Sequence, residues 1–556
     1  MPLAPPASLV SIGWSQEEKK LKPKTATKKR KGNRSVTGYG KKAKRRKKSI
    51  GDGESLTNAG TKQSLPLEQG NVSISVEGRV LTLDDSGDQH HTPCIEGHAL
   101  IQVLSGNVNV MGFELTMGSQ ATLNFPSWSN SVPIRVSGNA VVNVRSRSEE
   151  RKATVTPLVS APRPITISES WQSACDAVLG NDDKRMRISS VPNQASAESS
   201  RILICGAKST GKSTLLRYLV NRHLSRGEAV IVLDCDVGQP ELSPPGLLTL
   251  TLVEDPLLSL PHVHMKRAHL KAHFYGHVTS RNDPTTYLGM ISDLLEVYRQ
   301  YIENHQGQKE IPLVVNTDGW VKGFGFEVLS TIIERVRPTH VVQLTGNSPA
   351  KAFTVEALLP SQSTLVCAEA FESQSQADIP PQALRSLRLS TYFFDDATIW
   401  DRLDFGPMGI VDHDCEIANT LASRKPYVVA VNSVRCEVPF AVSPAAVLDL
   451  LNGSIVGLGV DVVGEIYPSC IGLGIVRSID RERMIMYILS PVPQDKIANV
   501  SVLLNGTLEL PVECVFRGVH AEAHPYIACS RKVDGIGGEI MKSRQNIGRK
   551  SLTKIR

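Results

Sequence analysis

The fold of this chain is decided by the stretch Gly206-Ala207-Lys208-Ser209-Thr210-Gly211-Lys212-Ser213. It reads G-x-x-x-x-G-K-S, with the apolar run 202–205 before it and a helical stretch from Ser213 to Leu224 after it. A strand, a glycine-rich turn and a helix in this order form a phosphate-binding loop, because backbone N–H groups and the helix dipole converge on one point. The sequence therefore predicts a nucleoside triphosphate site. Lys212 would reach the β- and γ-phosphates, and the Ser213 hydroxyl would bind Mg²⁺.

Length and charge divide the chain into regions. A chain of 556 residues is too long for one core and predicts about three domains. Residues 19–48 hold 16 Lys and Arg and no carboxylate, whereas the other 46 Lys and Arg are outnumbered by 55 Asp and Glu. This distribution indicates a flexible basic tail on an acidic body. The basic runs 28–31 and 44–48 are typical of nuclear or nucleolar targeting signals, although a solubilising tail is the alternative.

Cysteine and hydropathy patterns exclude several classes of protein. The ten cysteines include no C-x-x-C pair, and no secretory apolar segment precedes them. We therefore expect free thiols in a reducing compartment rather than disulfides or zinc. No apolar run approaches the roughly 18 residues that a membrane span needs. The sequence predicts a soluble, intracellular, nuclear protein with no membrane partner.

The pattern of apolar and polar residues along the sequence predicts an α/β protein with flanking β-rich domains. Apolar strands alternate with helical segments in the central part, which predicts a mainly parallel sheet with helices on both faces. Ligands then bind at the carboxyl ends of the strands. The expected parts are a disordered tail (1–68), a β-sandwich-like domain (69–150), a linker with a short helix capped by Ser168 (151–200), the P-loop domain (201–400) and a β-rich domain with a basic tail (425–556).

A second motif follows the next apolar strand, 229–233. This strand leads into Asp234-Cys235-Asp236-Val237-Gly238-Gln239-Pro240-Glu241. Mg²⁺ bound to phosphates takes one or two carboxylate contacts, and carboxylates at i and i+2 share one side of an extended chain. One aspartate could organise the metal while the other accepts a proton from an attacking hydroxyl. Which aspartate does which stays open, and an acidic turn without function is the alternative.

A third motif, Thr317-Asp318-Gly319-Trp320, comes directly after the apolar strand 311–315. An exposed indole at the carboxyl end of a strand could stack on a base, which is worth about 1–3 kcal/mol. A buried core tryptophan is the alternative. The position favours a ligand contact.

The order of these three motifs resembles the eukaryotic polynucleotide 5′-hydroxyl kinases. Four further segments resemble the nucleolar branch of that family, which processes pre-rRNA: Gly246–Thr251, Tyr275–Ser280, Leu384–Leu389 and Cys470–Val476. The resemblance covers roughly residues 70–530. It implies a central P-loop kinase between an amino-terminal β domain and a carboxy-terminal β-rich domain.

The same resemblance implies ATP-dependent phosphorylation of the 5′-hydroxyl end of RNA. The substrate would be pre-rRNA cut within internal transcribed spacer 2, in the nucleolus, together with the endonuclease that makes the cut for large-subunit ribosome biogenesis. ATP and Mg²⁺ would be bound by the loop from Gly206 to Ser213, with Thr214 next to it, and Asp234 and Asp236 would serve metal binding and hydroxyl activation. The residues assigned to the RNA are Gln239, Thr279, Ser280, Thr317, Gly319 and Trp320. The arginines of a mobile lid would be Arg385 and Arg388.

Three other functions compete with this interpretation. An ATP-bound scaffold would not need the intact Lys212, Ser213 and aspartate pair. A regulatory GTPase would carry an N-K-x-D motif in a late strand, and none is present. An ATPase switch within an RNA-processing nuclease complex stays open.

Overall fold

The computed structural model describes most of the chain between residues 74 and 510. The described ranges are 74–75, 79–83, 92–136, 138–147, 152–180, 199–265, 267–305, 311–346, 351–371, 379–393, 404–406, 409–411, 416–439 and 444–510. The predicted basic tail at the amino terminus and the basic tail of the predicted carboxy-terminal domain lie outside these ranges. Within them, no helix has the length and apolar character needed to cross a bilayer.

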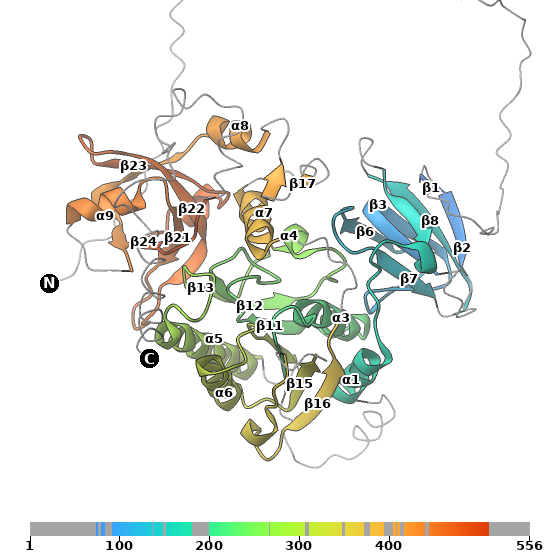
Figure 1. The fold of residues 1–556 in the computed structure, drawn as a ribbon. Helices are drawn as coiled ribbons and strands as arrows, with labels where there is room; N and C mark the ends of the chain where they lie inside the picture. Colours follow the sequence, from blue (N-terminus) through green and yellow to red (C-terminus); the bar gives the residue numbers. More distant parts are fainter. Residues whose placement is uncertain are drawn as a thin grey trace, which may run out of the picture. The chain divides into compact units, whose positions relative to one another are not determined.

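The first sheet contains nine strands (Figure 1). They are β1 (Ile74–Ser75), β2 (Arg79–Leu83), β3 (Pro93–Ser105), β4 (Val108–Val110), β5 (Phe113–Leu115), β6 (Gln120–Phe125), β7 (Val132–Val136), β8 (Ala140–Ser146) and β9 (Thr154–Pro157). The long strand β3 pairs with β7 and β9 at its start and with β6 and β8 along the rest. Gly97 lies at the change of partner with φ +98°, and a Cβ atom there would lie 2.8 Å from the Ala153 Cα. Strand β9 falls in the segment expected to be a linker and extends this sheet.

The second sheet carries the predicted alternation of strands and helices. Its strands, in spatial order, are β13 (Lys271–Phe274), β12 (Leu247–Val253), β11 (Val230–Asp234), β14 (Leu313–Asn316), β10 (Arg201–Gly206), β15 (His340–Thr345) and β16 (Thr364–Glu369). The five strands from β11 to β16 run parallel, whereas β12 is antiparallel to both of its neighbours, β11 and β13. No helix lies between β11 and β12, and a parallel return requires such a crossover. The sheet is therefore mixed.

Helices cover both faces of this sheet, as the alternation along β10 shows. Ile202 and Ile204 pack in one core with α1 (Glu169–Leu179) and α3 (Lys212–Ser225). Leu203 and Cys205 pack in the opposite core with α5 (Pro284–Asn304) and α6 (Phe324–Val336). Figure 1 shows α5 and α6 side by side on their face. The predicted helix at 169–179 is confirmed, and the Ser168 hydroxyl caps it by accepting the Trp171 N–H.

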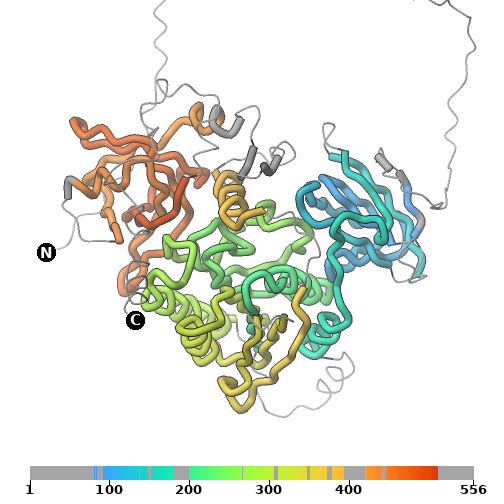
Figure 2. Tube along the Cα trace, in the orientation of Figure 1, coloured from blue at the N-terminus to red at the C-terminus, as the bar shows by residue number. Residues whose placement is uncertain are grey.

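The third sheet follows in the orange part of the chain trace (Figure 2). Its order is β19 (Tyr427–Ala430), β23 (Ile485–Leu489), β22 (Ser469–Asp480), β21 (Ile455–Val460), β24 (Val502–Asn505) and β20 (Arg435–Glu437). The remaining described elements are α4 (Pro261–His264), α7 (Pro381–Phe393), the hairpin of β17 (Asp404–Gly406) and β18 (Gly409–Val411), α8 (Glu416–Ser423), α9 (Pro444–Leu451) and α10 (Gln494–Ile497). The Tyr392 hydroxyl of α7 accepts the Leu473 N–H at 2.8 Å, which joins this helix to the sheet.

The β4–β5 turn of the first sheet contacts helix α3, which follows the phosphate loop. The Asn221 amide donates to the carbonyls of Met111 (2.9 Å) and Leu257 (3.0 Å), and its oxygen accepts the Leu257 N–H (2.7 Å). Gly112 lies so close to α3 that a Cβ atom would be 2.8 Å from the Tyr218 carbonyl oxygen. The fully buried Asn221 side chain thus satisfies backbone groups of two segments and fixes α3 against both.

Candidate active site

The predicted phosphate loop connects β10 to α3. Ser209 and Gly211 both have left-handed backbone angles, with φ of +59° and +93°. The Thr210 hydroxyl donates to the Ala207 carbonyl at 2.8 Å and closes the turn from within. These features give the curled backbone that a phosphate-binding loop requires.

Helix α1 supports this loop from behind. The buried Trp171 indole donates its Nε1–H to the Glu369 carbonyl at 2.7 Å. A Cβ atom on Gly211 would lie 3.0 Å from the Trp171 ring and 2.8 Å from the Phe371 Cβ. Gly211 is therefore required both for its positive φ and for the close approach of two aromatic residues.

Lys212 is a buried cation at the start of α3. Its Nζ donates to the carbonyls of Gly206 (3.0 Å) and Ala207 (3.1 Å), and the residue is only 7% exposed. Burial lowers the pKa of Lys212, while the charges of Asp236 and Asp318 act in the opposite direction. These carboxylates favour the charged form of the amine, and a buried cation interacts more strongly with a polyanionic ligand than an exposed one does.

The two aspartates of the second motif differ in environment. Asp234 is fully buried, and its carboxylate accepts hydrogen bonds from the Asn316 amide (2.9 Å), the Glu241 N–H (2.6 Å) and the Asp236 N–H (3.2 Å). Burial raises the pKa of Asp234 to about 7, although these donors act to lower it. Asp234 therefore organises the 234–241 loop.

Asp236 is partly exposed and faces the cations. Its Oδ1 accepts the N–H groups of Gly238 and Gln239, each at 3.0 Å. Its charge acts on Lys212 and on the α7 residues Arg385 and Arg388. Of the pair, Asp236 is the one with access to a reacting group.

The third motif lies directly against the phosphate loop. A Cβ atom on Gly319 would be 2.8 Å from both the N and the Cα of Lys208. Thr317 is buried, and its hydroxyl donates to the Ile204 carbonyl at 2.9 Å, so it anchors the turn to β10 from below. Trp320 is partly exposed, and the Arg281 guanidinium lies 4.6 Å above its ring.

Asp318 is a third carboxylate at the site that the sequence interpretation did not assign. It accepts the Ser280 hydroxyl at Oδ2 and the Trp320 N–H at Oδ1 (3.1 Å). Burial raises the pKa of Asp318, and the charge of Asp236 acts in the same direction. A carboxylate inside a short turn at the carboxyl end of a strand was the signal available in the sequence.

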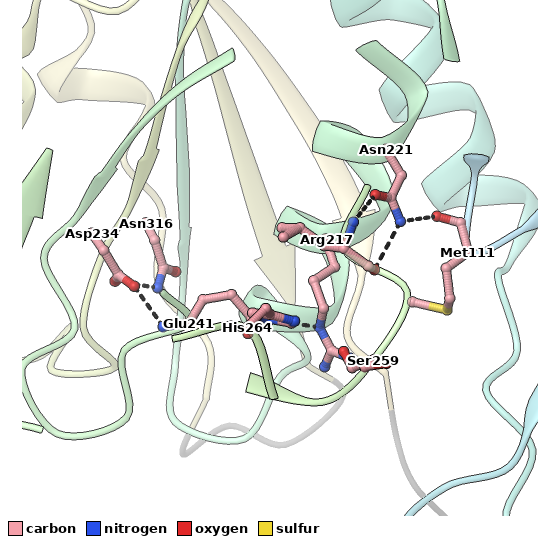
Figure 3. Close-up of polar contacts among 9 residues, drawn as sticks. Met111, Arg217, Asn221, Asp234, Glu241, Ser259, His264 and Asn316 are labelled. Atoms are coloured by element: carbon pink, nitrogen blue, oxygen red, sulfur yellow. Dashed lines mark hydrogen bonds and ion pairs between the residues drawn. The ribbon is translucent and has the colours of Figure 1, made fainter. Parts of the chain in front are cut away.

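Glu241 is a second residue that the sequence interpretation did not assign to the site. It is fully buried, and its Oε1 pairs with Arg217 Nε (3.0 Å) and accepts the His264 Nε2–H (2.8 Å), as Figure 3 shows. Its own N–H donates to Asp234. Glu241 thus connects α3, α4 and the aspartate loop through one carboxylate.

The predicted lid arginines lie on α7. Arg388 is 8% exposed, and the carboxylates of Glu241, Asp236 and Asp234 are the charges that stabilise its guanidinium. Arg385 is partly exposed and lies within the influence of Glu509 and Asp236. Both arginines therefore share Asp236 with Lys212.

The polar groups suit a Mg²⁺ ion that arrives with a triphosphate rather than a protein-only metal cage. The described residues contain no group of three or more His, Cys, Asp or Glu arranged to hold a metal. Mg²⁺ usually keeps several waters and takes one or two carboxylates plus phosphate oxygens. Beside Asp234, the buried Asn316 Oδ1 has no hydrogen-bond partner among the described residues, so an acceptor is left for water or an ion.

Comparisons with known proteins agree with this geometry. Residues 206–395 match the family described as mRNA cleavage and polyadenylation factor CLP1 P-loop, and residues 422–511 match the NOL9-like C-terminal domain. A solved structure entitled "Structure of wild-type Clp1p-Pcf11p (454 -563) complex" is 15% identical, with a TM-score of 0.52, over 78% of this chain and 98% of that one. At this identity the match shows the fold alone.

Relatives across eukaryotes are named polynucleotide 5′-hydroxyl-kinases. The chain is 36% identical over 349 residues to polynucleotide 5′-hydroxyl-kinase NOL9 of Arabidopsis thaliana, which covers 59% of this chain and 90% of the relative. The protein of the same name from Danio rerio is 26% identical over 81% of this chain and 75% of that protein. The human protein of this name is 28% identical over 60% of this chain and 51% of the human protein. Because it is 36% identical to the Arabidopsis thaliana protein over 90% of that protein, the chain belongs to the polynucleotide 5′-hydroxyl-kinase family.

Proposed function

We propose that this protein uses ATP to phosphorylate the 5′-hydroxyl end of RNA. The observation that supports this most directly is the position of Lys212. Its buried amine lies under the influence of Asp236 and Asp318, in a loop that the Trp320 turn touches through Gly319. A phosphate-binding cation, a candidate base and an aromatic platform therefore meet at one edge of the sheet.

The phosphate loop from Gly206 to Ser213, followed by Thr214, holds the phosphates in this proposal. Its backbone N–H groups and Lys212 bind the β- and γ-phosphate oxygens. Ser213 would contribute a ligand to Mg²⁺, and Asp234 holds the loop that presents Asp236 as the candidate base. Bound ATP supplies the phosphoryl group, and Mg²⁺ neutralises part of its charge.

The remaining residues position the nucleophile. Trp320 stacks on the terminal base, and Gln239 and Thr279 line the approach of the RNA end. The predicted contact of Ser280 with the RNA is replaced by a supporting role, because Ser280 is fully buried and its hydroxyl donates to Asp318. Asp236 accepts the proton of the 5′-hydroxyl. The hydroxyl oxygen bonds to the γ-phosphorus while the bond between that phosphorus and ADP breaks. Arg385 and Arg388 offset the charge that develops, so catalysis is positioning plus charge neutralisation.

We further propose that the substrate is pre-rRNA cleaved in internal transcribed spacer 2, in the nucleolus, with an endonuclease as the partner. Two observations support this: the relatives carry the NOL9 name, and the basic runs near the amino terminus are typical of nuclear or nucleolar targeting.

The test is incubation of the full chain with γ-labelled ATP and a 5′-hydroxyl oligoribonucleotide. Wild type and Arg299→Ala, a control at an exposed residue of α5, should label the RNA, whereas Lys212→Ala and Asp236→Asn should not. ATP hydrolysis without labelled RNA would instead support a switch. Nucleotide binding without turnover would support a scaffold.

A further inference from the structure

The loop 275–283, between β13 and α5, brings a cation onto the face of the proposed base platform. Arg281 is exposed, and its guanidinium lies 4.6 Å from the centroid of the Trp320 ring. None of the ion pairs among the described residues includes Arg281, so its charge has no carboxylate partner there. The sequence interpretation assigned Thr279 and Ser280 of this loop to the RNA and left Arg281 without a role.

One partly buried carboxylate fixes the residues on both sides of this stack. Asp318 accepts the Ser280 hydroxyl at one oxygen and the Trp320 N–H at the other. Ser280 is the immediate neighbour of Arg281 and is fully buried. Asp318 therefore sets where the backbone of Arg281 lies relative to the indole.

The loop itself is closed at its base. The Tyr275 hydroxyl accepts the Asp283 N–H at 2.9 Å and donates to the Asp283 carbonyl at 3.1 Å. A held backbone with a long exposed side chain allows the guanidinium to move while its origin stays in place. Arg281 can thus leave the indole without any change in the loop.

Helix α6 occupies another part of the indole. A Cβ atom on Gly325 would lie 2.3 Å from the Trp320 Cγ, and the Phe324 ring meets the indole edge-on at a centroid distance of 5.9 Å. The surface beneath Arg281 is therefore the indole face that a planar ligand can use.

We propose that Arg281 is a substrate-binding residue that exchanges places with the terminal base of the polynucleotide. The base takes the Trp320 face, and the displaced guanidinium pairs with the phosphodiester that follows the first nucleoside. Stacking of a base on an aromatic ring is stronger than an exposed cation–π contact, and a guanidinium matches two phosphate oxygens at once. Asp318 acts as a positioning residue. This inference rests on the proposed polynucleotide substrate.

The first test is binding of a fluorescent 5′-hydroxyl oligoribonucleotide to the full chain without ATP, measured by anisotropy at several salt concentrations. Arg281→Ala should raise Kd about tenfold and lower the salt slope by about one, because one phosphate contact is lost. Arg281→Lys should keep most of the slope, and Arg299→Ala should change neither value. Unchanged or tighter binding by Arg281→Ala would overturn the inference, since the arginine would then only shield the indole.

The second test addresses Asp318 through its neighbour. Ser280→Ala removes the hydroxyl that Asp318 holds without altering the charge near Lys212. We expect a several-fold higher KM for the oligonucleotide with little change in the KM for ATP. An equal rise in the KM for the oligonucleotide and the KM for ATP, or no rise in either, would contradict the positioning role.

These tests separate the inference from the proposed function. If the RNA binds in an Arg281-dependent way but is never phosphorylated, the kinase proposal fails and the inference stands. If the RNA is phosphorylated equally well by wild type and Arg281→Ala at limiting RNA, the inference fails and the kinase proposal stands.

Discussion

Gly319 and Lys208 touch backbone to backbone, so that a Cβ atom on Gly319 would stand 2.8 Å from both the N and the Cα of Lys208. The first residue belongs to the tryptophan turn and the second to the phosphate loop, 111 positions earlier in the chain. Backbone cannot move aside as a flexible side chain can. In the proposed mechanism, the contact therefore sets how closely a base on Trp320 would approach the phosphates in the loop.

We expect Gly319→Ala to push the two motifs apart. Overpacking of this kind costs about 1–3 kcal/mol, and a loss of that size in transition-state binding lowers kcat/KM in the kinase assay about 5-fold to 150-fold. Gly346→Ala is the matched control, because a Cβ atom there meets only the Lys351 side chain, which can move. Equal activity of the two variants would show that the close approach is incidental.

Glu241→Gln should destabilise the protein strongly. The substitution leaves Arg217 without its buried carboxylate and removes the negative charge that acts most strongly on Arg388, and breaking a buried pair costs about 3–5 kcal/mol. The measurement is urea unfolding at neutral pH. Arg299→Gln breaks an ion pair whose side chains are both 54% exposed, and the change there should be below about 1 kcal/mol. Similar midpoints for both variants would contradict a central role for Glu241.

Trp171→Phe should weaken the support of the phosphate loop. It removes the hydrogen bond to the Glu369 carbonyl and part of the ring surface against Gly211, for a loss of about 1–2 kcal/mol in stability. We also expect a several-fold weaker affinity for a non-hydrolysable ATP analogue, measured by calorimetry. Val463→Ala, at a fully exposed position, should leave both values unchanged.

Stability should fall on acidification partly because of His262. Burial lowers the pKa of His262 to about 3, and the nearby charges of Arg388, His264 and Arg217 act in the same direction. The unfolded chain takes up this proton near pH 6.5, so the native state loses stability as pH falls from about 6.5 towards 3. At pH 5 the loss amounts to about 2 kcal/mol.

His262→Phe should remove that part of the pH dependence. Phenylalanine retains a ring against Trp128, which lies 5.9 Å from the His262 ring centroid. Melting curves of wild type and variant, recorded at pH 5 and pH 7.5 at one ionic strength, give the comparison. A variant with the same shift of melting temperature as wild type would exclude His262 as the source.

Local patterns in the sequence predicted the strand–loop–helix unit at Gly206–Ser213, the helix capped by Ser168 and most strands of the central sheet. These elements depend on neighbours in the chain, so periodicity and capping residues suffice to find them. The three motifs were also placed correctly at carboxyl ends of adjacent strands, since strand order in such sheets concentrates ligand-binding turns at one edge.

What the sequence did not predict depends on distant partners. Strand β13 contains Lys271 and His273, and these polar residues hid the strand in the sequence. In the fold, Lys271 pairs with Asp293 and Glu465, and His273 contacts Asp293. Asp318 and Glu241 likewise acquire their roles only from burial beside Lys212 and Arg217. Arg281 had no signal in a local pattern, because its partner Trp320 lies in another segment.

Helix α1 comes before the phosphate loop in the chain, and its tryptophan is part of what the loop rests on. During synthesis the ribosome therefore completes helix α1 before it makes the phosphate loop. A recombinant fragment that begins at β10 would keep every motif residue of the proposed nucleotide site. It would lack helix α1, which supports the phosphate loop. Boundaries for expression should accordingly be drawn upstream of Ser168.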